Sequence, residues 1–183
     1  MLLTTTSGLA LLRFRVFSFR AMTSTFSGPS FRYISPTELG ELMKSGKVSM
    51  KDYAVVDVRD DDFLGGNIVG CVRAPSSKYL TTVDDLVSKT KDVPKMIFHC
   101  ALSQQRYSRF SAPEMSISRI LFAFRGPKAA RIYAETRNNR LNPGETPTQE
   151  IYVLRGGFTE FQRLFKGDPI LVEKWRKEVW QGY

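Results

Sequence analysis

The sequence predicts an α/β fold in which helices cover both faces of a parallel sheet. Three short apolar runs, at 53–60, 95–100 and 150–158, are continuous rather than alternating, as is typical of strands buried on both faces. Segments with helical spacing or helix-capping residues lie between these runs. Because strands that alternate with helices form parallel sheets, a ligand site is expected at the carboxyl ends of the strands.

Local signals place the elements along the chain. Ser35, Pro36 and Glu38 are typical of a capped helix start, and Gly46 marks the end of that helix. The predicted elements, in chain order, are a helix over 35–46, a strand at 53–60, a short strand at 68–72, a helix over 83–91, strands at 95–100 and 150–158, and helices over 159–165 and 172–180.

The composition favours one domain with an N-terminal extension. At 183 residues and 42% hydrophobic content, the chain can bury one core. The net charge is +9, but acidic and basic residues are interspersed after residue 38, so no basic stripe indicates nucleic-acid binding. One histidine and two cysteines are too few for a disulfide framework or an ordinary metal site. We therefore expect a reducing compartment, no metal, no cofactor and no nucleic-acid partner.

Residues 1–32 form the predicted extension and contain no acidic residue. Their Arg, Ser, Thr and Phe content is typical of a mitochondrial transit peptide, whereas a true start at Met22 would leave a disordered tail. The apolar runs are short and interrupted by arginine, so no membrane span is predicted. The expected location is cytoplasmic and/or nuclear, or mitochondrial if residues 1–21 are translated. The predicted domain covers 33–183.

A cysteine follows the apolar run at 95–100, and an arginine stands six positions after it, as Arg106. If the chain turns from strand into helix between Cys100 and Arg106, its backbone N–H groups converge on a concave site for a tetrahedral oxyanion. The same amides and the helix dipole favour the thiolate of Cys100. Arg106 would bind two oxygens of the anion, and Ser103 would hydrogen-bond the sulfur. A cysteine in this setting attacks phosphorus, arsenic or sulfane sulfur.

Four stretches of the chain together resemble one family. They are "VVDVRDDDFLGGNIVGCVRAPSS", "IFHCALSQQR", "RGPKAA" and "YVLRGGFTEFQ". They are similar to the rhodanese superfamily, and within it to the branch of the cell-cycle dual-specificity phosphatases and the eukaryotic arsenate reductases, especially its small fungal single-domain members. The resemblance covers residues 33–180. Sulfurtransferase members have a six-residue loop, whereas the seven residues from Cys100 to Arg106 match the phosphatase and arsenate-reductase branch.

The resemblance implies a role for each matching residue of the loop. Cys100 would be the nucleophile, and Arg106 would bind the oxyanion. His99 would shape the loop and stabilise the thiolate rather than transfer a proton. The anion cradle would be formed by the amides of Arg106 and of the residues that precede it, which are Ala101, Leu102, Ser103, Gln104 and Gln105.

Two further pairs match the family pattern outside the loop. Asp57 and Arg59 match an Asp-x-Arg element with a mainly structural role, in which the side chains pair with loop backbone or with a neighbouring charge. Gly156 and Gly157 match a "GGF" turn, where a small backbone lets the chain pass close by.

The chain departs from the family pattern at several positions. Cell-cycle phosphatases carry glutamates at the loop positions that hold Ala101 and Gln105 here, so no carboxylic acid is built into the cradle to protonate a leaving group. The cysteine that pairs with the nucleophile in some relatives would fall at Val58, and Cys71 is expected to pack as a small apolar side chain. If the chain reduces arsenate, the second thiol should come from glutathione or glutaredoxin.

An additional segment at 107–125 interrupts the match. In the family, Gly-Pro follows the loop arginine at once, but here "RGPKAA" begins at Arg125, which makes Arg125 an alternative loop arginine. One hypothesis is that the segment is a retained or mispredicted intron. The other is a genuine insertion, in which a capping box from Ser111 to Glu114 opens an amphipathic helix that serves as a lid or partner surface.

These features predict a cysteine-dependent phosphatase or arsenate reductase. Its substrate would be a phosphorylated protein or a small oxyanion, and no membrane partner is expected. Two alternatives stay open at this point. One is a non-catalytic rhodanese-like binding module that the insertion has disabled. The other is a thiosulfate-type sulfurtransferase, which the loop length disfavours.

Overall fold

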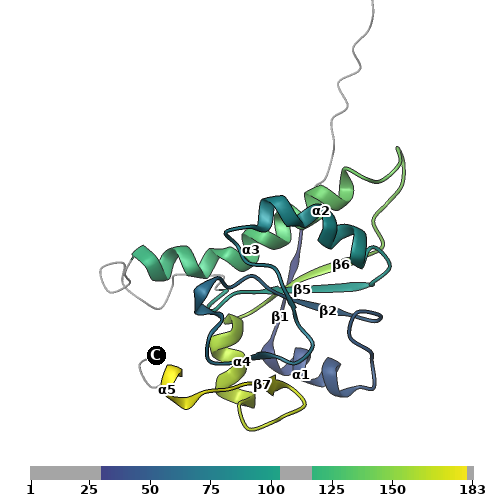
Figure 1. Cartoon of the computed structure of the whole chain (residues 1–183). Coiled ribbons are helices and arrows are strands. Elements are labelled where there is room, and N and C mark those ends of the chain that lie inside the picture. The colour runs from purple at the N-terminus through teal and green to yellow at the C-terminus, as the bar shows by residue number, and fades with distance from the viewer. Residues whose placement is uncertain (1–29, 104–116, 181–183) are drawn as a thin grey trace, which may run out of the picture.

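A parallel sheet of five strands forms the centre of residues 30–103 and 117–180, which are the residues that the computed structural model describes (Figure 1). The strand order is β1-β6-β5-β2-β4, and every neighbouring pair is parallel. The strands are β1 (Arg32–Ile34), β2 (Ala54–Asp57), β4 (Val72–Arg73), β5 (Lys95–His99) and β6 (Glu150–Leu154). The predicted α/β class is confirmed, and β5, which ends just before Cys100, lies in the middle of the sheet.

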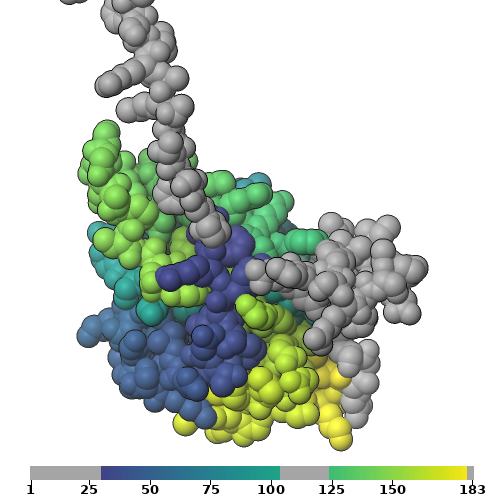
Figure 2. All heavy atoms as spheres, turned by 180° about the vertical axis from the view of Figure 1, so that it is seen from behind, coloured from purple at the N-terminus to yellow at the C-terminus, as the bar shows by residue number. Residues whose placement is uncertain are grey.

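Helices cover both faces of this sheet, as the sequence predicted. Alternate residues of β2 show the two faces, because Val56 belongs to the apolar cluster under α2 and α3 and Val55 to the cluster under α1 and α4. Figure 1 shows these two helix pairs on opposite sides of the sheet, and Figure 2, from behind, shows α1 in blue beside α4 in yellow-green. The helices are α1 (Pro36–Lys44), α2 (Tyr79–Thr90), α3 (Ile117–Asn138) and α4 (Gly157–Phe165).

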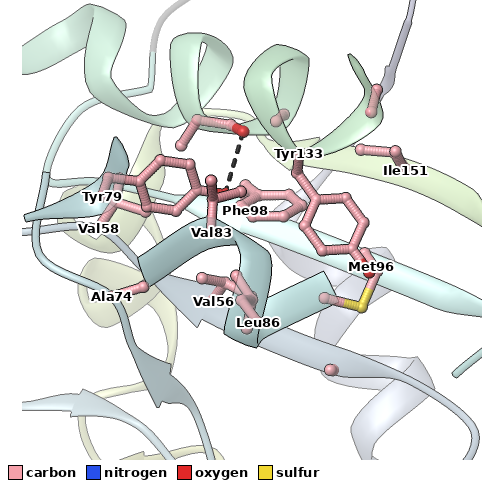
Figure 3. Close-up of a cluster of buried hydrophobic side chains, with 14 of the residues drawn as sticks. Val56, Val58, Ala74, Tyr79, Val83, Leu86, Met96, Phe98, Tyr133 and Ile151 are labelled. Atoms are coloured by element: carbon pink, nitrogen blue, oxygen red, sulfur yellow. Dashed lines mark hydrogen bonds between the residues drawn. The ribbon is translucent and has the colours of Figure 1, made fainter. Parts of the chain in front are cut away.

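The apolar cluster under α2 and α3 contains side chains from the sheet and from these two helices (Figure 3). Phe98 of β5 and Tyr133 of α3 pack at a centroid distance of 5.2 Å. The buried Tyr79 hydroxyl donates a hydrogen bond of 3.1 Å to the Ala129 carbonyl, which ties α2 to α3. Burial raises the pKa of Tyr79, so this hydroxyl stays a donor. The second half of α3 is thereby fixed against the sheet beside Cys100.

Three local predictions differ from the structure. The predicted strand at 68–72 is split, because Gly70 adopts a φ of 69° and separates β3 (Asn67–Ile68) from β4. The predicted helix over 172–180 is wrong at its start, where β7 (Val172–Glu173) pairs antiparallel with β3 and buries Val172. Only α5 (Lys177–Trp180) of that segment is helical. The sequence analysis also missed β1, which begins at Arg32, the last residue of the predicted extension.

The predicted insertion meets the described chain in α3. This helix begins at Ile117 and continues without a break past Pro127 to Asn138. The capping box at 111–114 and the rest of the extension at 1–29 lie outside the described residues. None of the described helices has the length and apolar content to cross a membrane.

Replacing Ser35 with alanine is expected to destabilise the protein by about 1 kcal/mol. The Ser35 hydroxyl accepts the Glu38 amide at 3.2 Å, and the Glu38 carboxylate accepts the Ser35 amide at 2.7 Å, so both halves of a capping box are present. Urea unfolding measures the change in the free energy of unfolding. Thr37→Ala, in the exposed first turn of the same helix, is the control, and an equal loss in both variants would contradict the capping role.

Candidate active site

Cys100 follows directly after the central strand β5, where the chain leaves the sheet. Its side chain is fully buried, and it lies at the carboxyl edge of the parallel sheet, where the sequence predicted a ligand site. The Val58 amide donates to the His99 carbonyl at 2.9 Å, so the sheet-like contact between the two chain segments extends to the residue before the thiol. The sulfur therefore lies in the buried interior, at the end of the central strand.

Ser103 folds back onto the thiol of Cys100. Its amide donates to the Cys100 sulfur at 3.2 Å, and its hydroxyl oxygen lies 3.1 Å from the same sulfur. The hydroxyl oxygen also accepts the Cys100 amide at 2.9 Å. Ser103 achieves this with a φ of 36°, which a non-glycine residue rarely adopts. An N–H group and a hydroxyl of one residue therefore converge on the sulfur.

The N-terminus of α4 holds the carbonyl groups of the same loop. The Phe158 amide donates to the Cys100 carbonyl and the Thr159 amide to the Ala101 carbonyl, both at 2.9 Å. Gly157, with a φ of 57°, passes so close that an added Cβ would lie 2.4 Å from the Cys100 carbonyl oxygen. Because these carbonyls point toward α4, the amides of Ala101 and Leu102, which belong to the same trans peptide units, point away from α4.

A buried charged group supports the site from β2. The Arg59 guanidinium donates to the Asp57 carboxylate at 2.6–3.0 Å, and neither side chain is exposed to solvent. Burial works to raise the pKa of Asp57, but the hydrogen bonds and the positive charge of Arg59 lower it below its ordinary value. Arg59 also donates to the Gly66 carbonyl at 2.9 Å and stacks over the Phe158 ring at 4.2 Å.

His99 lies between this ion pair and the thiol loop. Its Nδ1 atom is 3.3 Å from the Cys100 carbonyl oxygen, and its Nε2 atom is 3.6 Å from the Asp57 carboxylate. Burial lowers the pKa of His99 and outweighs the attraction of Asp57, so the ring is neutral near pH 7. A neutral imidazole packed against the loop backbone fits the shaping role that the resemblance implied.

Arg125 reaches the same site from α3. Its guanidinium contacts Asp60 at 3.0 Å and Asp62 at 2.5 Å. Burial works to lower the pKa of Arg125, but Asp62, the charge of Cys100 and Asp60 raise it above its ordinary value. The next residue, Gly126, packs so tightly that an added Cβ would lie 2.5 Å from the Ser103 hydroxyl. The structure therefore brings Arg125 and the thiol loop together.

Most of the predicted site residues lie in one place. Those that the structure brings together are Asp57, Arg59, His99, Cys100, Ala101, Leu102, Ser103 and Arg125, with Gly156 and Gly157 behind them. Gln104, Gln105 and Arg106 lie outside the described residues. The sequence analysis missed Asp60, Asp62 and Gly126. The acid run that follows "DVR" was the available signal for Asp60 and Asp62, although the sequence did not reveal their partner.

Cys71 does not join this site. Its thiol lies 3.6 Å from the Asn67 side chain, and it packs among the apolar residues under α1 and α4. Burial and the charge of Asp57 raise the pKa of Cys71 to about 12, which keeps it protonated and unreactive near neutral pH. The second cysteine thus fills space, as expected. Within the described ranges, no group of His, Cys, Asp and Glu side chains is arranged to hold a metal ion.

The parallel sheet and the buried thiol under converging donors define a class of enzymes that act on anions through a cysteine. Comparisons with known proteins identify the branch. The dual specificity phosphatase ibp1 of Schizosaccharomyces pombe is 32% identical to the chain over 156 residues, which cover 77% of this chain and 95% of that protein. No model of a protein family matches the chain.

Solved structures agree with this similarity. The structure of Ygr203w, a yeast protein tyrosine phosphatase of the rhodanese family, superposes with a TM-score of 0.60 at 28% identity and covers 85% of this chain and all of that one. An As/Sb reductase from Leishmania major superposes with a TM-score of 0.52 at 26% identity, over 78% of this chain and 84% of that one. The chain belongs to the CDC25-like phosphatase and arsenate reductase branch of the rhodanese superfamily, and it is an enzyme of that branch.

Replacing Gly157 with alanine is expected to destabilise the protein by about 2–4 kcal/mol, because the new Cβ meets the Cys100 carbonyl and the backbone has a positive φ. Turnover of the folded protein should also fall, because the collision displaces the thiol loop. Thermal unfolding and turnover measure the two effects. Gly167→Ala, where an added Cβ meets nothing within 4 Å, is the control. A Gly157→Ala variant with unchanged turnover would contradict the close approach.

Proposed function

We propose that Cys100 is the nucleophile of a phosphatase or arsenate reductase and that Arg125 binds the oxyanion substrate. The observation that carries this proposal is the Ser103 amide and hydroxyl on the Cys100 sulfur, with the charged Arg125 beside them. Arg125 opens the "RGPKAA" motif, which in the family follows the cysteine loop directly. A guanidinium at this place can bind two oxygens of a tetrahedral anion at once.

For a phosphate ester, the Cys100 thiolate attacks phosphorus while the bond from phosphorus to the leaving oxygen breaks. A phosphocysteine forms, and water then attacks its phosphorus, which releases inorganic phosphate and the thiol. The carboxylates of Asp60 and Asp62 are engaged by Arg125, so we expect the leaving oxygen to take its proton from solvent. Phosphotyrosine-like aryl esters, whose leaving groups tolerate this, are therefore the favoured phosphate substrates.

Arsenate is the second candidate, because its oxygens exchange with water without a difficult leaving group. Cys100 would condense with arsenate, losing one water, to form a sulfur–arsenic bond. A glutathione thiolate then attacks the Cys100 sulfur, which breaks that bond, leaves the electron pair on arsenic and releases arsenite. A second thiol from glutathione or glutaredoxin reduces the mixed disulfide and restores Cys100.

The proposed location remains cytoplasmic and/or nuclear, or mitochondrial if residues 1–21 are translated.

Two readings compete with this proposal. A binding module disabled by the insertion would show no turnover that depends on Cys100. A thiosulfate sulfurtransferase would form a persulfide on Cys100, detectable as a mass increase of one sulfur after incubation with thiosulfate. A binding module does not need an arginine held beside the thiol loop, and the seven-residue spacing from Cys100 to Arg106 disfavours the sulfurtransferase.

Cys100→Ser is expected to lower the hydrolysis of an aryl phosphate, or glutathione-dependent arsenate reduction, by about 10³-fold or more. Arg125→Ala should lower kcat/KM by about 10²–10³-fold, since it removes the charged donors for the oxyanion. Arg106→Ala is the matched control for the choice of arginine and should cause little change. A large loss in Arg106→Ala with normal turnover in Arg125→Ala would assign the anion to Arg106 instead.

Deleting residues 107–125 tests what the insertion does. Joining Arg106 to Gly126 gives the same polypeptide as joining Gln105 to Arg125, so the product carries one loop arginine in the family position. Turnover should rise by about tenfold or more, because the arginine and the loop amides are then fixed by one short connection. Cys100→Ser in the shortened chain is the control. Equal turnover in both chains would show that the insertion does not disturb the site.

A further inference from the structure

Two aspartates after β2 hold the guanidinium of Arg125. Arg125 Nη1 donates to Asp60 at 3.0 Å and to Asp62 at 2.9 Å, and Nη2 donates to the other oxygen of Asp62 at 2.5 Å. The Asp62 contact is thus a two-pronged carboxylate–guanidinium pair, which fixes the plane of the guanidinium as well as its place. The Arg125 side chain is 10% exposed, so this pairing is shielded from solvent.

The aspartates are themselves fixed to the core. Asp60 accepts the Ser76 hydroxyl at 2.5 Å and the Ser77 amide at 2.9 Å, which anchors it to the turn before α2. The Asp60 amide donates to Asp62 at 3.0 Å, so the two carboxylates are placed relative to each other. The segment starts directly after the buried Arg59, which donates to the Asp62 carbonyl at 3.4 Å. The two carboxylates that pair with Arg125 are therefore held in place by hydrogen bonds of their own segment and of the turn before α2.

We propose that Asp60 and Asp62 are positioning residues that orient Arg125 for the substrate oxyanion. The inference rests on the proposed role of Arg125 in binding that anion. The aspartates engage both Nη1 hydrogens and one Nη2 hydrogen of Arg125. Because a guanidinium is planar, holding these donors beside the thiol loop also fixes the orientation of the whole group.

The negative charges of Asp60 and Asp62 also affect anion binding directly, and this second effect defines the test. Two carboxylates around one guanidinium leave one excess negative charge near an anion site, which by itself weakens anion binding. Partial burial works against ionisation, yet hydrogen bonds from Ser76, Ser77 and Arg125 hold the pKa of Asp60 at about 2, so it is charged at every pH of interest. Positioning and repulsion therefore predict opposite effects when a carboxylate is replaced by its neutral amide.

The experiment uses the full chain with Asp62→Asn and Asp60→Asn. Two measurements are made: kcat/KM on an aryl phosphate, and the rise in unfolding temperature that inorganic phosphate causes. If the aspartates position Arg125, Asp62→Asn lowers kcat/KM by about tenfold or more and reduces the phosphate-induced rise, and Asp60→Asn has a smaller effect in the same direction. Asp61→Asn, an exposed neighbour with the same loss of charge, should change both quantities by less than about twofold.

A double-mutant cycle separates positioning from a general structural role. In the Arg125→Ala background, Asp62→Asn should cause no further loss, because Asp62 acts through Arg125. Asp62→Glu, which keeps the two-pronged carboxylate, should recover most of the activity that Asp62→Asn loses. An equal loss in both backgrounds, or tighter phosphate binding in Asp62→Asn, would overturn the inference.

The two proposals fail in different ways. If Arg125→Ala leaves phosphate binding and kcat/KM unchanged, the proposed role of Arg125 is wrong and the inference falls with it. If Arg125→Ala is impaired but Asp60→Asn and Asp62→Asn both behave like wild type, Arg125 binds the anion without help from the aspartates. Should Asp62→Asn fail to fold, Asp60→Asn and Asp62→Glu still give the comparison, because each keeps part of the support.

Discussion

The candidate active loop depends on backbone hydrogen bonds between the two residues that follow β5 and the start of α4. The buried carbonyls of Cys100 and Ala101 need donors, and the first amides of α4 need acceptors, so each set satisfies the other. This exchange fixes the direction of the chain as it leaves the sheet. Two residues after Ala101, the Ser103 amide then donates to the sulfur. Only glycine at position 157 lets the two backbones come this close.

A second chain of contacts leads from the core to the charged side of the site. A fully buried ion pair is costly to desolvate, and Asp57–Arg59 is compensated by backbone carbonyls and by aromatic rings that cover the guanidinium. The pair fixes the segment after β2, and that segment presents Asp60 and Asp62 to Arg125. The placement of Arg125, the proposed anion-binding residue, therefore depends on the segment after β2 as well as on α3.

The sequence predicted elements whose signals are local. The buried runs of β2, β5 and β6, the Ser35 cap and the cysteine at a strand end were all readable from residue patterns. Failures occurred where a distant partner decides the structure. Val172 has helical spacing with its neighbours but pairs with β3, and Arg32 reads as part of a polar extension but pairs with β6. The role of Asp60 and Asp62 needed Arg125, which is more than sixty residues away along the chain.

The proposed insertion lies between the thiol loop and the "RGP" motif that begins at Arg125. Proline has no amide to donate and favours the first turn of a helix, so "RGP" is suited to a helix start directly after the loop. Here Pro127 lies inside α3, which begins ten residues earlier, at Ile117. The contacts of Gly126 with Ser103 and of Arg125 with the aspartates nevertheless bring the motif to the thiol. Long-range contacts therefore place Arg125 beside the thiol loop, and for that reason we propose that Arg125 depends on its pairing with Asp60 and Asp62.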